Sequence, residues 1–120
     1  MLSEALNKYN AKFVKREFRS KVIHDFSCVN EFLAQFITDF TDPDAANDLL
    51  QAFESVLRHQ IAKDIVLAPT LLTIEICPDF TSLYHDPEYA DPTNPIMQLP
   101  TIDFAALVRA WAQFLAQPSA

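Results

Sequence analysis

Residues 79–91, with the sequence DFTSLYHDPEYAD, contain the densest group of chemically capable side chains in the chain. His85 stands beside Asp86 and near Asp79 and Tyr84, so an imidazole, carboxylates and a phenol occur within one short stretch. Such a group has the components of a general base or a metal site. Neither a nucleophile nor a second metal ligand stands at a diagnostic spacing from His85. A small hydrolase centred on His85 is therefore the last-ranked interpretation.

The other candidate ligands lack partners at ligand spacing. His24 and His59 lie on expected helices without a carboxylate or a cysteine at ligand spacing on the same face. Cys28 and Cys77 are far apart in the sequence and match no zinc or redox spacing, which predicts free, buried thiols. The sequence predicts no catalytic residue, no metal and no cofactor, and the chain is not expected to be an enzyme.

The chain contains no glycine, although average usage near 7% would supply roughly eight in a chain of this length. Glycine allows the backbone to adopt positive φ and to approach a phosphate closely. Nucleotide-binding loops and the nucleophile elbow of hydrolases depend on that freedom. The function is therefore expected to depend on the protein surface more than on pocket chemistry.

The same stretch, residues 79–91, has the composition of a protein-binding patch. Tyrosine offers a large contact area at a small entropic cost, and clustered carboxylates orient the encounter with a basic surface. In the ordinary alternative, Phe80 and Tyr84 belong to the core and the acidic residues form a solvated loop. The predicted partner-binding residues are Asp79, Tyr84, Asp86, Glu88, Tyr89 and Asp91.

Charge is distributed unevenly along the chain. Nine basic and 16 acidic residues give a net charge of −7. Beyond Lys21, three basic residues face 14 acidic ones, a balance of −11. A field of this sign repels nucleic acid and membrane phosphates and attracts basic partners, although an acidic surplus can also serve only solubility. Six basic residues lie within the first 21 positions: Lys8, Lys12, Lys15, Arg16, Arg19 and Lys21.

The basic N-terminal stretch suits nucleic acid if it forms a helix, but Glu4 and Glu17 interrupt it. We expect these cations to pair with the protein's own carboxylates, and we expect no nucleic acid and no membrane among its partners. The chain of 120 residues, half of them apolar, fits a single domain spanning residues 1–120. The N-terminal sequence MLSEALNKYN lacks the pattern of a secretory signal, so a soluble cytoplasmic protein is expected.

The first quarter of the chain is ambiguous in secondary structure. Apolar residues from Leu2 to Phe26 recur at intervals of three and four, which favours one bent helix or two helices. The β-branched and aromatic residues of FVKREFRSKVI also suit an extended strand, so residues 11–26 stay undecided between helix and strand.

Two helices are predicted next. Ser27 is expected to cap the first, which carries an apolar stripe reaching Phe40. Asp42 is expected to be the N-cap of the second and Pro43 its first helical residue, with the helix continuing to about Lys63. Because the connection is short, the two helices should pack together as an antiparallel or sharply angled pair.

Strands are predicted in the second half of the chain. Residues 71–77 alternate so that Leu72, Ile74 and Ile76 share one face. Residues 79–85 suit a second, weaker strand, and residues 96–99 suit an edge strand. A final helix, capped by Thr101, should cover the sheet with Trp111 at the centre of the contact. The predicted fold is α+β, mainly helical, with a small antiparallel sheet packed by a C-terminal amphipathic helix.

The C-terminal segment resembles small immunity proteins of bacterial contact-dependent growth inhibition and related polymorphic toxin systems. The resemblance is carried by MQLPTIDF at residues 97–104 and LVRAWAQFL at residues 107–115, a short strand followed by a proline-preceded amphipathic helix with one tryptophan. It departs from the usual pattern in having alanines where acidic residues commonly fill the exposed face. The resemblance implies an α+β protein that binds the C-terminal domain of a cognate toxin, often a nuclease with a basic cleft, and blocks its active site.

These observations lead to one functional hypothesis and one rival. The chain is expected to be a non-catalytic immunity protein that binds and neutralises a cognate, basic nuclease toxin domain. The rival is an acidic adaptor or regulatory subunit that acts as a homodimer through apolar helix faces. The sequence leaves the oligomeric state open.

Overall fold

The computed structural model describes residues 2–69, 72–85 and 95–117. Over this part of the chain, 43% is helix and 30% is strand, in an α+β arrangement with two antiparallel sheets. The expectation of a mainly helical protein with one small sheet is therefore wrong. The elements are α1 (Leu2–Lys8), β1 (Lys12–Phe18), β2 (Lys21–Ser27), α2 (Glu31–Thr38), α3 (Pro43–Leu57), β3 (Asp64–Leu67), β4 (Thr73–Ile76), β5 (Phe80–Tyr84), β6 (Met97–Pro100) and α4 (Thr101–Ala116).

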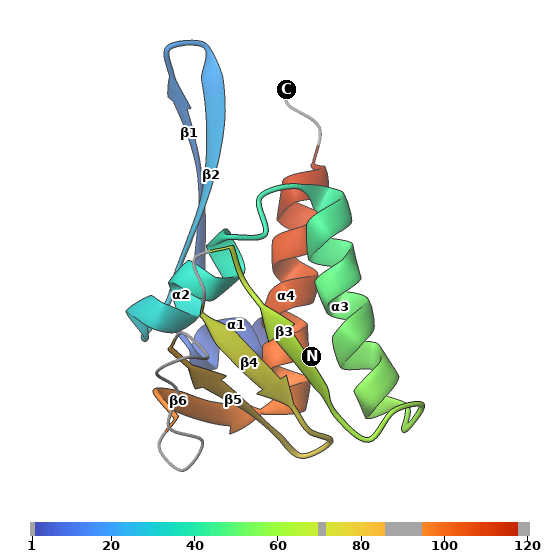
Figure 1. Cartoon of the computed structure of the whole chain (residues 1–120). Coiled ribbons are helices and arrows are strands. Elements are labelled where there is room, and N and C mark those ends of the chain that lie inside the picture. Colours follow the sequence, from blue (N-terminus) through green and yellow to red (C-terminus); the bar gives the residue numbers. More distant parts are fainter. Residues whose placement is uncertain (1, 70–71, 86–94, 118–120) are drawn as a thin grey trace.

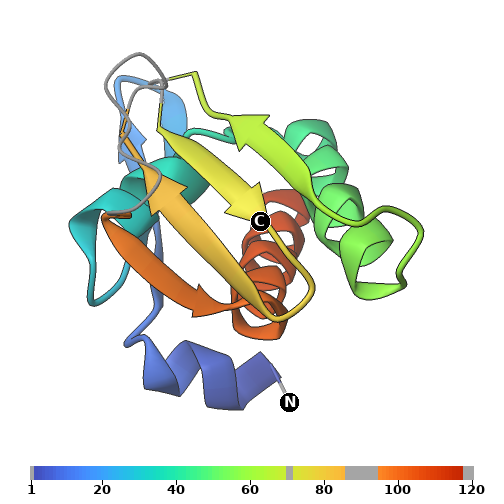
Figure 2. The same ribbon diagram turned by 60° about the horizontal axis from the view of Figure 1, so that its bottom comes forward.

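The two sheets differ in setting. Strands β3, β4, β5 and β6 form a four-stranded antiparallel meander in sequence order. Helices α3 and α4 lie side by side behind one face of this sheet, and no helix of the described residues covers its other face (Figure 2). Strands β1 and β2 form a separate hairpin that extends beyond the other elements (Figure 1).

The core lies between the four-stranded sheet and the helices. Ile74, Ile76 and Leu83 project inward and are fully buried, as are Phe53 and Phe104 from α3 and α4. The two helix rings lie 4.8 Å apart between centroids. The predicted face of β4 and the strands near residues 79–85 and 96–99 are confirmed. Strand β3 was missed because its four residues are too short to show an alternation of their own.

Residues 11–26 take the extended alternative. Phe13 and Phe26 stand directly opposite each other in the β1–β2 register, with ring centroids 5.3 Å apart. Both rings also face Trp111 of α4, at 6.4 and 6.2 Å. A helix over the same residues cannot bring these two rings together across a hairpin, so the aromatic contact favours strands. The helical spacing was coincidental.

The start of α2 differs from expectation, whereas the start of α3 is confirmed. Ser27 belongs to β2, and the N-cap of α2 is Asn30, whose Oδ1 accepts hydrogen bonds from the Phe32 and Leu33 amides at 2.9 and 3.0 Å. Asp42 caps α3 by accepting from the Ala45 amide at 2.9 Å. The two helices do not pair with each other as expected, since α2 packs on β2 and α3 on α4.

Helix α4 also begins and packs differently. Thr101 is its first residue, and its buried hydroxyl reaches the sheet, 2.9 Å from Thr81 Oγ1 and bonded to the Cys77 carbonyl. Trp111 is fully buried, and its Nε1 donates to the Phe40 carbonyl oxygen at 2.8 Å. Trp111 therefore joins α4 to the base of the β1–β2 hairpin, and does not sit at the centre of the contact with the four-stranded sheet.

Four described residues adopt positive φ although each has a Cβ, which disfavours this conformation. Asn10 (53°) follows α1 and His59 (59°) follows α3, while Arg19 (50°) and Ser20 (67°) form the two-residue β1–β2 turn. After α3, the His59 amide donates to Val56 and the Gln60 amide to Ser55, which is a Schellman motif. This motif ends α3 at Leu57, well short of the expected Lys63.

A glycine at position 59 should stabilise the protein. The left-handed conformation costs a residue with a Cβ about 1 kcal/mol, which His59→Gly removes. We expect the free energy of unfolding, measured by urea titration, to rise by about that amount. The matched control is Gln51→Gly at an exposed position inside α3, which should lower it by about 1 kcal/mol. A loss of stability in His59→Gly would contradict the assignment.

Candidate protein interface

The structure separates the two described members of the predicted patch. Asp79 is exposed in the turn between β4 and β5, and Tyr84 is half-buried at the other end of β5. Five residues of extended chain rise about 16 Å, so these two side chains do not meet. The other four predicted contact residues lie outside the described residues: Asp86, Glu88, Tyr89 and Asp91.

Sequence reasoning missed Leu67 and Ile65, which cross-strand pairing places on the same sheet face as Tyr84. Leu67 pairs with Thr73, and Thr73 pairs with Tyr84, so all three lie in one row on the face turned away from the helices. Ile65 pairs with Glu75 in the next row of that face. The outer sheet face is defined here by Ile65, Leu67, Glu75, Phe80 and Tyr84.

The outer sheet face exposes apolar side chains. Ile65 is 61% exposed, and Leu67 and Phe80 are each 50% exposed. Exposed apolar groups that share a face mark an interaction surface more often than isolated ones do. Phe80 is thus not a core residue, whereas Tyr84 is partly buried. In the sequence, the signal for Ile65 and Leu67 was the apolar run IVL after Asp64, which is too short to show which side chains share a face.

Polar groups on the same face are acidic or paired. Glu75 accepts from the Cys77 thiol at 3.6 Å and lies 3.8 Å from Lys63 Nζ.

Burial raises the pKa of the Cys77 thiol, and the charge of Glu75 raises it further; burial likewise raises the pKa of Cys28. Both cysteines are free and partly buried. At neutral pH they stay protonated, which makes them poor nucleophiles.

Two of the three histidines contact aromatic rings. The His85 ring lies edge-on to Phe32 with centroids 5.3 Å apart, and His24 lies edge-on to Phe114 at 5.2 Å. Within the described ranges, no group of three or more His, Cys, Asp or Glu side chains is placed to hold a metal ion. Nor does any helix in those ranges combine the length and apolarity needed to cross a membrane.

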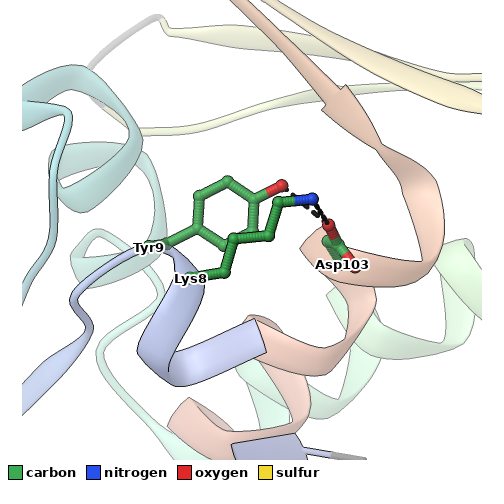
Figure 3. Close-up of polar contacts among 3 residues, drawn as sticks. All are labelled: Lys8, Tyr9 and Asp103. Carbon is green, nitrogen blue, oxygen red and sulfur yellow. Dashed lines mark hydrogen bonds and ion pairs between the residues drawn. The ribbon is translucent and has the colours of Figure 1, made fainter. Parts of the chain in front are cut away.

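The closest group of a phenol, a carboxylate and an amine joins α1 to α4 (Figure 3). The Tyr9 hydroxyl donates to Asp103 Oδ2 at 2.7 Å, and Lys8 Nζ donates to the same oxygen at 3.1 Å. Burial raises the pKa of Tyr9, and the hydrogen bond and charge of Asp103 raise it further. A phenol held protonated in this way is a donor and no base. The group is a clamp between two helices.

The basic N-terminal residues lie mainly on the hairpin, and ion pairs of Arg16 and Lys8 support the expected pairing with internal carboxylates. Arg16 Nε is 2.9 Å from Asp25 across the hairpin, and Lys8 pairs with Asp103. Both pairs are partly solvent-exposed and contribute little to stability.

No family model matches this sequence, and neither a curated protein nor a solved structure gives a significant match. The resemblance to immunity proteins stays a prediction that rests on residues 97–115 alone.

Removal of the Tyr9 hydroxyl should change how stability depends on pH. A raised pKa means that the native state favours the protonated phenol, so its contribution is complete below the usual pKa of 10.0 and is lost as the pH rises above it. We expect Tyr9→Phe to lower the free energy of unfolding by about 1–2 kcal/mol at pH 7. Urea titrations from pH 7 to 11 should show this difference shrinking above pH 10. A constant difference across that range would contradict the clamp.

Proposed function

We propose that this chain is a non-catalytic binding protein that receives a basic protein partner on its outer sheet face and on the predicted contact residues of the stretch 79–91. The supporting observation is that Ile65, Leu67 and Phe80 are at least half exposed on a sheet face that no described helix covers. Outside the β1–β2 hairpin, four basic residues face 14 acidic ones, a balance of −10. An apolar surface within an acidic protein suits a partner that is basic around an apolar centre.

The two kinds of side chain do different work in such a contact. Burial of apolar groups at the centre of an interface supplies most of the binding energy. Carboxylates at its rim accelerate the encounter with a cationic surface and fix its orientation. In this proposal Ile65, Leu67 and Phe80 supply the apolar contacts, while Asp79 and the acidic residues of 86–91 steer the partner.

The partner class follows from the resemblance at residues 97–115. We assign the chain the role of an immunity protein that binds and neutralises the C-terminal domain of a cognate toxin. A nuclease toxin binds phosphates with lysines and arginines, so carboxylates of residues 79–91 would take the place of phosphates, with Tyr84 and Tyr89 as anchors.

The rival, a homodimer through apolar helix faces, receives less support. Among the described residues of the helices, Ile102 is the one large apolar side chain that is exposed, at 68%. The other exposed apolar side chains lie on strands and connections. Helices α3 and α4 turn their apolar stripes toward each other and the sheet.

The proposal predicts that the gene immediately upstream encodes the toxin domain, and binding to that domain tests it. With that domain made catalytically inactive, we expect tight binding by calorimetry that weakens with added salt, because screening shortens the reach of surface charges. The double variant Leu67→Lys, Phe80→Lys should weaken binding by roughly 100-fold or more. The control Val29→Lys changes an equally exposed side chain away from this face and should have little effect.

Two outcomes would overturn the proposal. One is an upstream gene that encodes no toxin domain. The other is binding that the double variant leaves unchanged.

A further inference from the structure

The β1–β2 hairpin, residues 12–27, is called the arm, and one of its faces is unusually apolar for an exposed element. In the antiparallel register, Val14 pairs with Asp25, Arg16 with Ile23 and Phe18 with Lys21, so these residues share a face. Val14, Ile23 and Phe18 are 44%, 43% and 60% exposed. Because Ile23 lies diagonally between the other two, the three side chains form a continuous stripe, called the arm stripe.

Among the described residues, the arm is attached to the body by the packing of α2 on β2 and by aromatic contacts near its base. Phe13 and Phe26 hold it against Trp111, and His24 contacts Phe114, all on the face opposite the arm stripe. Beyond this base, the hairpin extends away from the helices and the four-stranded sheet (Figure 1). A two-stranded hairpin gains little stability of its own. An apolar stripe on such an element is more useful to an intermolecular contact than to folding.

The arm and the rest of the chain carry opposite charges. Residues 12–27 contain five basic residues and two acidic ones, a balance of +3. The remainder has a balance of −10, with four basic and 14 acidic residues. Lys12, Arg16, Lys21 and Asp25 share the face of the arm stripe, and Arg16 pairs with Asp25, so Lys12 and Lys21 are the cations that flank the apolar side chains.

We propose that the arm stripe of one copy docks on the outer sheet face of a second copy, and that two arms exchanged in this way form a two-fold dimer. The two surfaces are complementary in polarity and in charge. Phe18 and Ile23 of one copy contact Ile65 and Leu67 of the other. The cations that flank the stripe face the acidic body of the other copy. Pairing of two arms with each other would instead bring like charges together. A two-fold exchange satisfies both arms at once and leaves no open end.

The inference goes beyond the proposed toxin partner and does not depend on it. Both occupants use the outer sheet face, so they exclude each other. Failure of the dimer leaves toxin binding possible, and failure of toxin binding leaves the dimer intact. The two experiments therefore fail separately.

Sedimentation equilibrium of the full chain tests the dimer. The arm variant Phe18→Thr, Ile23→Thr and the face variant Ile65→Thr, Leu67→Thr each shorten exposed side chains while keeping good strand formers. We expect the wild type to be dimeric and each variant to weaken dimerisation by roughly 100-fold or more. The matched control Val29→Thr, at an exposed position on neither surface, should stay dimeric.

Mixing the two variants gives the sharpest readout. The mixture pairs the intact arm of the face variant with the intact face of the arm variant, so one of the two contacts returns. We expect heterodimers that are more stable than either variant alone and that dissociate as salt is raised.

Several results would overturn the proposal. A monomeric wild type would do so directly. A face variant that stays fully dimeric would indicate arm-to-arm pairing. A third result is a monomer that binds a labelled DNA duplex and loses this binding in the double variant Lys12→Ala, Lys21→Ala. That result would indicate that the arm binds nucleic acid.

Discussion

The burial of Trp111 is the contact on which the arrangement of the other elements depends. Its indole nitrogen bonds to the Phe40 carbonyl between α2 and α3, and its ring meets Phe13 and Phe26 at the base of the arm. One side chain of α4 thus fixes both the arm and the α2–α3 connection. Its ring buries a large apolar area, and its one polar atom has a partner, so burial carries no unsatisfied donor. The exposed apolar side chains of the outer sheet face, Ile65, Leu67 and Phe80, take no part in this cluster.

The absence of glycine shapes the backbone. Helix ends and a two-residue hairpin turn need positive φ, which glycine adopts without strain. Here Asn10 tolerates that conformation well. In His59, Arg19 and Ser20 the Cβ lies too close to the following carbonyl oxygen, which lowers stability. Sharp backbone reversals are therefore possible in this chain, at some cost in stability. A backbone without side chains that can closely surround a phosphate requires glycine, and this chain has none.

Sequence reasoning was reliable where a residue's role was local. Asp42 caps α3 because its side chain needs only the next turn of backbone, and Ile74 and Ile76 are buried together because strand alternation fixes their side. It was undecided or wrong where distant residues settle the matter. Residues 11–26 form strands because Phe13 and Phe26 meet Trp111 some 90 positions away. The pairing of Leu67 with Tyr84 through Thr73 likewise depends on the meander, which the sequence does not display.

Opposite charges within one chain attract, so charge alone favours a basic arm folded onto its own acidic body. The structure opposes this in two ways. The aromatic cluster fixes the base of the arm, and cross-strand pairing over seven residues keeps the hairpin extended for about 20 Å. Folding it back would break the contacts of Phe13 and Phe26 with Trp111. The attraction between arm and body is then better satisfied between copies than within one.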